Sequence, residues 1–210
     1  MYKFMSGIKP TGQLHLGNYI NTIKPILKGE CQNKTIILIA DGHSLTQRTE
    51  DIFSQSIDLA KILYSFGLKN IVLQSQFPQI FELQWILSCY ADKGLMNRAH
   101  GYKSRTTENE INDRDIDTGV NMGLFSYPVL MTADLCIFDS EYVFIGSDQT
   151  QHVEMAKEII NKFNYYNKIE DLLKVPKPIV QHQTSLQGSD GRKMSKSYNN
   201  TIPLMCPEKE

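Results

Sequence analysis

A glycine-containing loop near the beginning of the chain combines cationic and hydrogen-bonding side chains. It runs Ser6–Gly7–Ile8–Lys9–Pro10–Thr11 and leads into His15–Leu16–Gly17–Asn18, where a helical pattern begins. The spacing is neither a dinucleotide fingerprint nor a Walker A loop. It still suits a nucleotide, because His15 and Asn18 can donate hydrogen bonds to phosphates near a helix start and Gly17 leaves room for an adenine or a ribose. Glycine-rich turns are also common before helices that bind no ligand. The segment is therefore either a nucleotide-binding loop or an ordinary turn.

A second segment, near the end of the chain, places two lysines three residues apart on a loop flanked by glycine. Its residues are Gly188, Gly191 and Arg192, followed by Lys193–Met194–Ser195–Lys196–Ser197. Such a loop can close on the phosphates of a nucleotide and stabilise the charge that builds on a departing pyrophosphate. The alternative is a solvated basic loop without a chemical role.

Short apolar runs alternate with longer helical patterns along the chain. The pattern predicts strands over Tyr2–Met5, Lys34–Ala40, Asn70–Gln74 and Tyr142–Ile145. It predicts helices from about His15 to Lys28, from Asp51 to a terminator at Gly67, over Pro78–Tyr90, and over Asp148–Phe163 with Asp148 as the N-cap. Strand–helix–strand units of about 30 residues indicate right-handed crossovers. The fold class is therefore α/β, with a doubly wound parallel sheet.

Ligands of an open parallel sheet bind beyond the carboxyl ends of its strands. Besides the first loop, two segments follow predicted strands there: Asp41–Gly42–His43 and Gly146–Ser147–Asp148–Gln149. Both place glycine beside polar or acidic side chains, which suits close approach of a ligand. Ala99–Thr118, by contrast, is polar and lacks periodicity, and we expect a surface insertion or mobile loop.

Composition excludes some function classes. The chain has 210 residues, 41% of them hydrophobic, and a formal net charge of −1, so it lacks the charge of a nucleic-acid coat protein or a polybasic membrane binder. No apolar run is long enough to span a bilayer, and we expect a soluble cytoplasmic protein. Cys31, Cys89, Cys136 and Cys206 have no zinc-site spacing and are expected to be buried apolar side chains.

The two loops together carry a resemblance to a known family. HLGN at 15–18 and KMSKS at 193–197 resemble the two signature sequences of class I aminoacyl-tRNA synthetases, and the chain is most similar to the tryptophanyl branch. The matching stretches are SGIKPTGQLHLGNY (6–19), ADGHSLT (40–46), SYPVLMTADLCIF (126–138), GSDQTQHVEMAKEIINKFN (146–164) and DGRKMSKSYNN (190–200). The resemblance implies a Rossmann-like catalytic domain over residues 1–200, which activates tryptophan with ATP and transfers it to tRNA(Trp).

The resemblance also implies residue roles. His15, Asn18, Lys193 and Lys196 would be the catalytic residues. ATP would be held by Lys9, Pro10, Thr11, Gly17, Asn18, Gly146, Ser147, Asp148, Lys193, Met194, Ser195, Lys196 and Ser197. Tryptophan would lie against Met5, Gly7, His43, Tyr127, Met131, Asp134, Val143, Ile145 and Gln149. Mg²⁺ would arrive with ATP, and no protein-bound metal is expected.

Asp134 matches the carboxylate that accepts the indole N–H in this family. Since indole has a single N–H donor, a buried acceptor would reject phenylalanine, which leaves that acceptor unpaired. Met5 and Ser147 depart from the family pattern, which has an aromatic and an acid at these positions. GSDQ also occurs in tyrosyl-tRNA synthetases, so tyrosine activation is an alternative. A catalytically weak module that binds tryptophan or ATP is another.

The end of the chain resembles the start of a further helix. Residues 201–210 include Pro207 beside Glu208, which is typical of a helical first turn. Because the family continues there into a helical domain that binds the anticodon, we expect amino-acid activation at a reduced rate and weak charging of tRNA. The resemblance further implies a homodimer, with apolar helix faces near residues 77–95 as candidate contacts.

Overall fold

In the part of the chain that the structure describes, five parallel strands form one sheet in the order β3-β2-β1-β4-β5. The computed structural model describes residues 2–12, 14–28, 31–47, 50–181, 186–192, 194, 198 and 200–205. The strands are β1 (Phe4–Ile8), β2 (Thr35–Ile39), β3 (Ile71–Leu73), β4 (Tyr142–Gly146) and β5 (Lys177–Gln181). The predicted α/β fold class with a doubly wound parallel sheet is confirmed.

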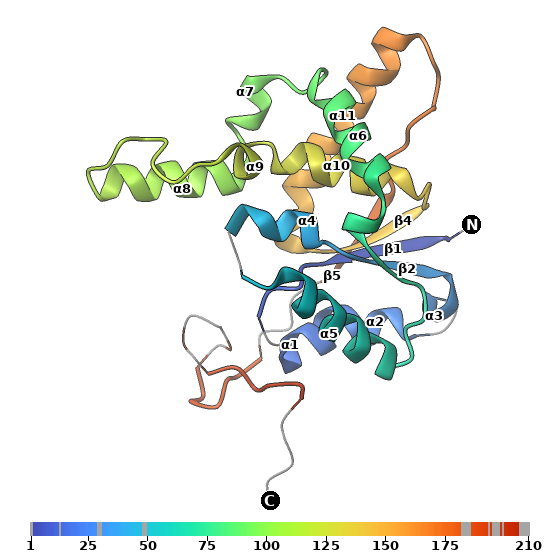
Figure 1. Cartoon of the computed structure of the whole chain (residues 1–210), viewed down its shortest axis with the longest axis vertical. Coiled ribbons are helices and arrows are strands. Elements are labelled where there is room, and N and C mark those ends of the chain that lie inside the picture. The colour runs from blue at the N-terminus through green and yellow to red at the C-terminus, as the bar shows by residue number, and fades with distance from the viewer. Residues whose placement is uncertain are drawn as a thin grey trace, which may run out of the picture.

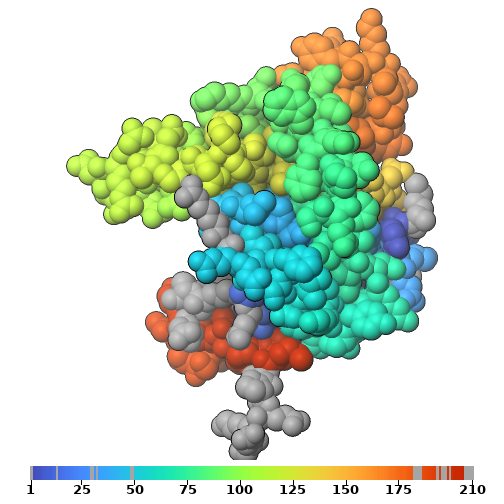
Figure 2. Space-filling view, in the orientation of Figure 1, coloured from blue at the N-terminus to red at the C-terminus, as the bar shows by residue number. Residues whose placement is uncertain are grey.

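Helices cover both faces of this sheet (Figure 1). One face carries α1 (Leu16–Asn18), α2 (Lys24–Ile26), α3 (Cys31–Lys34) and α5 (Ile52–Ser65). The other carries α6 (Pro78–Ser88), α10 (Tyr127–Ile137) and α11 (Thr150–Asn167). Shorter helices are α4 (Asp41–Ser44), α7 (Lys93–Met96) and α9 (Met122–Phe125), and α8 (His100–Ile111) projects from the body (Figures 1 and 2).

The alternating side chains of β2 show why the sheet needs both layers. Ile37 and Ile39 are buried in the cluster that contains Leu59 and Leu63 of α5, whereas Leu38 is buried against Ile80 and other residues of the α6, α10 and α11 layer. Successive side chains of a strand point to opposite faces, so a strand covered on both sides must be apolar throughout. The continuous apolar run over Lys34–Ala40 was therefore a reliable strand signal, although Lys34 itself ends α3.

The helix predicted from His15 to Lys28 is present as a continuous helical run over residues 16–26, but it is not α-helical throughout. The chain forms α1, then a wider π-helical turn over Tyr19–Ile23, and then α2 with Pro25 in its first turn. Proline has no N–H to donate within a helix and its ring crowds the preceding turn. A π-helical turn directly before it absorbs this break.

Of the two alternatives expected for residues 99–118, a surface insertion agrees with the projecting α8 and a loop does not, because the segment is mostly helical (Figure 1). Residues 100–111 form α8, and the chain then folds back along it. Asn109 is buried, and its Nδ2 donates to the backbone oxygens of Ile116 (3.0 Å) and Thr118 (2.8 Å). These tertiary hydrogen bonds stabilise a helix whose polar sequence has no apolar face to signal it.

Three further sequence predictions are corrected by the structure. Asp148 is not the N-cap of α11, because a 3-10 turn spans Ser147–Gln149 and Gln149 caps the helix that begins at Thr150. The first strand begins at Phe4 and continues to Ile8, so Gly7 lies in the strand. Cys89 is exposed and Cys31 half-buried, while only Cys136 among these described cysteines is buried as expected.

Two elements that position the site had no predicted counterpart. β5 carries Pro178 within the strand and pairs with β4 alone, and edge strands tolerate a proline. α10 is buried over most of its circumference, so its sequence lacks the apolar period of a half-exposed helix. No described helix has both the length and the apolar character needed to cross a membrane. Cys206–Glu210, the predicted helix start, lies outside the described residues.

Candidate functional site

A cavity of about 580 Å³ lies at the carboxyl ends of the central strands. It brings together predicted site residues from distant parts of the chain, namely Met5, Gly7, Lys9, His15, Gly17, Asn18, His43, Tyr127, Met131, Asp134, Val143, Ile145, Gly146, Asp148, Gln149 and Met194. Pro10, Thr11 and Ser147 are not among its lining residues. Lys193, Ser195, Lys196 and Ser197 lie outside the described residues. The individual role of each residue stays a prediction.

Asp134 of α10 provides a buried carboxylate in this cavity. His43 Nε2 donates to its Oδ2 (2.8 Å) and Gln74 Nε2 donates to its Oδ1 (2.7 Å). Burial raises the pKa of Asp134, while the hydrogen bonds from His43 and Gln74 oppose that rise. A carboxylate has about four lone-pair sites, so these two donors leave acceptor capacity for a ligand.

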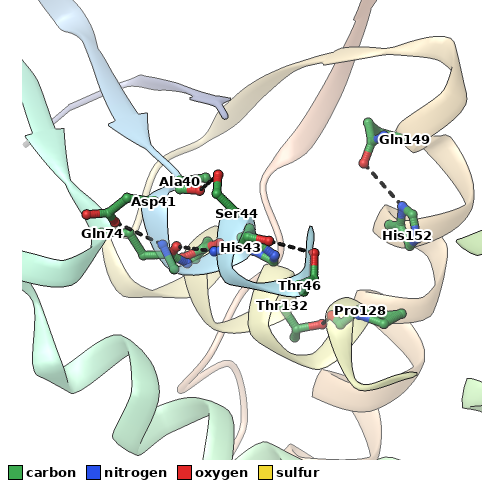
Figure 3. Close-up of polar contacts among 12 residues, drawn as sticks. Ala40, Asp41, His43, Ser44, Thr46, Gln74, Pro128, Thr132, Gln149 and His152 are labelled. Atoms are coloured by element: carbon green, nitrogen blue, oxygen red, sulfur yellow. Dashed lines mark hydrogen bonds and ion pairs between the residues drawn. The ribbon is translucent and has the colours of Figure 1, made fainter. Parts of the chain in front are cut away.

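α4 places His43 beside this carboxylate, directly after β2. The backbone N–H of His43 donates to Gln74 Oε1 (3.2 Å), so the Gln74 amide lies beside the backbone of α4 (Figure 3). Asp41, two residues earlier, accepts from the backbone N–H groups of Gly42 (3.0 Å) and Ser75 (2.9 Å). The ends of β2 and β3 are thereby held together under α10.

Tyr127 lies between two histidines and a lysine. Its ring centroid is 4.2 Å from that of His43 and 5.4 Å from that of His152, and Lys9 Nζ lies 4.6 Å from the Tyr127 centroid. Burial, followed by the charges of Asp134 and Asp148, raises the pKa of the Tyr127 phenol, which therefore stays protonated and can donate. Burial lowers the pKa of Lys9, and the nearby Asp148 opposes this shift.

The turn after β4 orients a second set of polar groups. Gln149 Nε2 donates to Asp148 Oδ2 (2.6 Å), and His152 Nδ1 lies 3.2 Å from Gln149 Oε1 (Figure 3). Burial is the main cause that lowers the pKa of His152 to about 4, so the imidazole is neutral near pH 7. Since an amide oxygen can only accept, Nδ1 carries the proton and His152 fixes the orientation of the Gln149 amide.

The first signature segment is tied to the end of the described chain. His15 pairs with Pro203 in an antiparallel bridge, and the N–H of Leu16 donates to the oxygen of Ile202 (2.9 Å). Asn18 Oδ1 accepts from the backbone N–H of His15 (3.0 Å). A Cβ on Gly17 would lie 2.9 Å from the His15 ring, so Gly17 first makes room for that imidazole rather than for a ligand.

The base of the lysine-containing loop lies beside the same cavity. Leu186 and Met194 line the cavity and are joined by a hydrogen bond from Met194 N to Leu186 O (2.7 Å). Asp190 accepts from Asn200 Nδ2 (2.7 Å) and from Arg192 Nε (2.8 Å). The Asn200 hydrogen bond is the main cause that lowers the pKa of Asp190.

Gln74 is a buried partner of Asp134 that the sequence did not single out. It directly follows β3, and the rule that ligands gather beyond strand ends applies to it as it did to His43. Ser6, in the middle of β1, and Gln181, at the end of β5, also line the cavity and were not predicted as site residues. Within the described residues no cluster of three or more His, Cys, Asp or Glu side chains could hold a metal ion.

A doubly wound parallel sheet with a cavity across the ends of its central strands, lined by residues of the first signature segment and by Met194, is typical of a class of nucleotide-dependent enzymes. The model of the family described as tRNA synthetases class I (W and Y) matches residues 1–210, and the chain belongs to this family.

Within the family, the curated relatives point to one branch. The tryptophan–tRNA ligase of Xanthomonas campestris pv. campestris is 40% identical over 217 residues, which cover 99% of this chain and 50% of that protein. The tryptophan–tRNA ligase of Bordetella pertussis is 41% identical over 210 residues, 96% of this chain and 47% of the relative. The chain thus spans about half the length of the curated relatives it matches.

Solved structures show the same fold. The tryptophanyl-tRNA synthetase of Campylobacter jejuni, in complex with ADP and tryptophan, has a TM-score of 0.83 at 36% identity, over 97% of this chain and 63% of that one. The tyrosyl-tRNA synthetase of Archaeoglobus fulgidus has a TM-score of 0.71 at 22% identity, over 98% and 61% of the two chains. The second likeness is one of fold alone.

Proposed function

We propose that this chain carries the amino-acid activation step of a tryptophan–tRNA ligase. The tryptophan carboxylate attacks the α-phosphorus of ATP, and the bond to the bridging oxygen of the β-phosphate breaks. The products are tryptophanyl-adenylate and pyrophosphate. The observation that carries this proposal is the buried Asp134 carboxylate in a cavity that also holds the first signature segment.

The tryptophan site is assigned to the deep part of the cavity. Met131, Val143 and Ile145 provide apolar walls there, together with Met5. Asp134 accepts the indole N–H with its remaining lone pairs. Phenylalanine has no such donor and would leave a buried carboxylate unpaired, which is the physical basis of its rejection. His43, Tyr127 and Gln149 surround the amino-acid part of the substrate, and Gly7 lies in the strand beneath it.

The nucleotide site is assigned to the outer part of the cavity. Lys9 faces the triphosphate as a cation, and His15 and Asn18 bind ATP at the first signature. Pro10 and Thr11 continue the loop along the phosphates. Gly17, Gly146, Ser147 and Asp148 are assigned to the adenine and ribose side. Lys193 and Lys196, with Met194, Ser195 and Ser197, are assigned to the pyrophosphate. Mg²⁺ arrives bound to ATP.

Catalysis in this scheme is positioning and charge stabilisation. The substrate carboxylate is itself the nucleophile, so no covalent intermediate with the protein is needed. The Lys9 ammonium lies in a partly buried place, where its interaction with phosphate charge is stronger than in water. The lysines of the second signature add charge where pyrophosphate departs.

Tyrosine activation is the second candidate, because GSDQ occurs in both branches. The names of the relatives at about 40% identity favour tryptophan. Tyrosine would also need a partner that both donates to and accepts from its phenol. Asp134, with its own donors in place, offers only acceptor capacity.

The test is ATP–pyrophosphate exchange with each amino acid in turn, with Lys196→Ala as the control. We expect exchange with tryptophan that exceeds this control at least tenfold, and none with phenylalanine. Exchange with tyrosine instead would favour the second candidate. Calorimetric binding of tryptophan without exchange would indicate a binding module. The absence of both tryptophan binding and exchange would refute the assignment.

Partners and location follow from this proposal. tRNA(Trp) would receive the activated amino acid in the cytoplasm. A homodimer contact is assigned to the exposed side of α6, where Trp85 is 73% and Ile86 47% exposed. Sedimentation of Trp85→Lys at several concentrations tests it.

A further inference from the structure

We infer that Gln74 is a positioning residue that determines the specificity of the tryptophan site, through Asp134. This inference rests on the proposed function. Gln74 lies in the turn directly after β3, and its side chain is completely buried. Its Nε2 donates to Asp134 Oδ1 (2.7 Å), and its Oε1 accepts from the backbone N–H of His43 (3.2 Å).

Both ends of the Gln74 amide are therefore committed. An amide has a donor end and an acceptor end, and here the His43 N–H fixes which end is which. The donor end must consequently face Asp134. Gln74 thus stabilises the ionised, acceptor form of a carboxylate that burial alone would disfavour.

His43 and Gln74 each donate to a different oxygen of the Asp134 carboxylate. His43 Nε2 occupies one lone pair of Oδ2 and Gln74 one of Oδ1. The carboxylate plane is thereby held at both oxygens, and the remaining lone pairs have fixed directions. A fixed acceptor discriminates a substrate N–H more sharply than a carboxylate that is free to rotate toward other partners.

The surrounding chain leaves Gln74 little freedom to move. Gly42 lies so close that a Cβ there would be 2.8 Å from Gln74 Oε1. The next residue, Ser75, is bound to Asp41 through its backbone N–H (2.9 Å) and its hydroxyl (2.5 Å). The turn that carries Gln74 is thus bound to the segment after β2 through the Gln74 amide and through Ser75.

The experiment compares tryptophan with 3-(benzothiophen-3-yl)alanine, in which sulfur replaces the indole N–H. The ratio of their kcat/KM values in ATP–pyrophosphate exchange measures recognition of the N–H alone. Gln74→Met keeps the length of the side chain and removes both hydrogen-bonding ends. The matched control is Gln76→Met, the same change two residues away, where the side chain is exposed.

We expect Gln74→Met to lower this ratio about tenfold, as for loss of one hydrogen bond to a charged group. The decrease should be in kcat/KM for tryptophan, with the analogue changed by no more than about twofold. Gln76→Met should leave the ratio at the wild-type value. Gln74→Asn, whose amide is one methylene too short to span His43 and Asp134, carries the same expectation if Gln74→Met does not fold.

Two results would overturn the inference. One is an unchanged ratio in a folded Gln74 variant, and the other is an equal loss for both substrates, which indicates a general structural role. Failure of the proposed function looks different, because the wild-type chain would then show no tryptophan-dependent exchange or no preference over the analogue.

Discussion

Replacing Gly42 with alanine adds one methyl group at a half-buried place between the buried Gln74 side chain and the ring of Phe81. The new Cβ would lie 2.8 Å from Gln74 Oε1 and 3.0 Å from two ring carbons of Phe81. Ordinary contacts begin at about 3.4 Å, so these neighbours must move by about half an ångström. Gln74 cannot move alone, because both ends of its amide are hydrogen-bonded.

The magnitude follows from two opposing effects. Forcing a methyl group into a well-packed interior costs about 1–3 kcal/mol. Replacing glycine also reduces the entropy of the unfolded chain, which stabilises the folded state by about 0.4–1 kcal/mol. The net expectation for Gly42→Ala is a decrease of about 1–2 kcal/mol in the free energy of unfolding, and a Tm lower by about 5 °C.

The chain contains a matched control for this substitution. Gly94, in the short helix α7, is exposed, and a Cβ there would meet nothing within 4 Å. Gly94→Ala should therefore raise the free energy of unfolding by about 0.5–1 kcal/mol. Urea titration followed by circular dichroism measures both variants. If Gly42→Ala is as stable as the wild-type chain, the crowding around Gln74 is refuted. A Gly42→Ala variant that is destabilised as expected but keeps full discrimination against the benzothiophene analogue would refute the link to Asp134.

Further predictions concern a lysine, a histidine and two cysteines. Lys9→Met should raise the KM for ATP about tenfold and leave the KM for tryptophan unchanged, as measured by exchange kinetics, because the ammonium is assigned to the phosphates. His152 has a pKa lowered from 6.5 to about 4, so the unfolded chain binds the proton more tightly and stability falls as the pH drops through this range. The loss should reach at most about 3 kcal/mol and should be absent in His152→Gln, as measured by urea unfolding at pH 7 and pH 4.5. Burial raises the pKa of Cys136 to about 12, so a thiol reagent should label the exposed Cys89 and spare Cys136 until the chain unfolds, as mass mapping can show.

Elements with one dominant physical cause were predictable from the sequence. β2 is apolar from Ile36 to Ile39 because helices cover both its faces, and the run over Lys34–Ala40 therefore predicted a buried strand. The helices α5 and α6 were predicted because each has clear boundary signals, an aspartate cap at Asp51 and a proline at Pro78. Such local signals act within a few residues, where sequence order and spatial order agree.

Elements that depend on distant partners were not predictable in the same way. α8 has a polar sequence, and its Asn109 finds its partners only when the chain folds back. α10 is apolar on nearly every side, which removes the periodicity that identifies a surface helix. The π-helical turn in the first helix lies directly before Pro25, and the periodic pattern did not indicate it.

The sequence by itself determined the kind of site and its place. Glycine and polar residues after successive parallel strands must gather at one edge of the sheet, since parallel strands present their carboxyl ends together. The two signature segments predicted the family to which the chain belongs. Only the tertiary structure decided which of these groups are partners. Gln74 and Asp134 are 60 residues apart, and a hydrogen bond of 2.7 Å between two buried side chains depends on the packing of β3 beneath α10. A hydrogen bond requires a donor and an acceptor that are aligned and placed to within a few tenths of an ångström. Such placement exists only once the layers are packed.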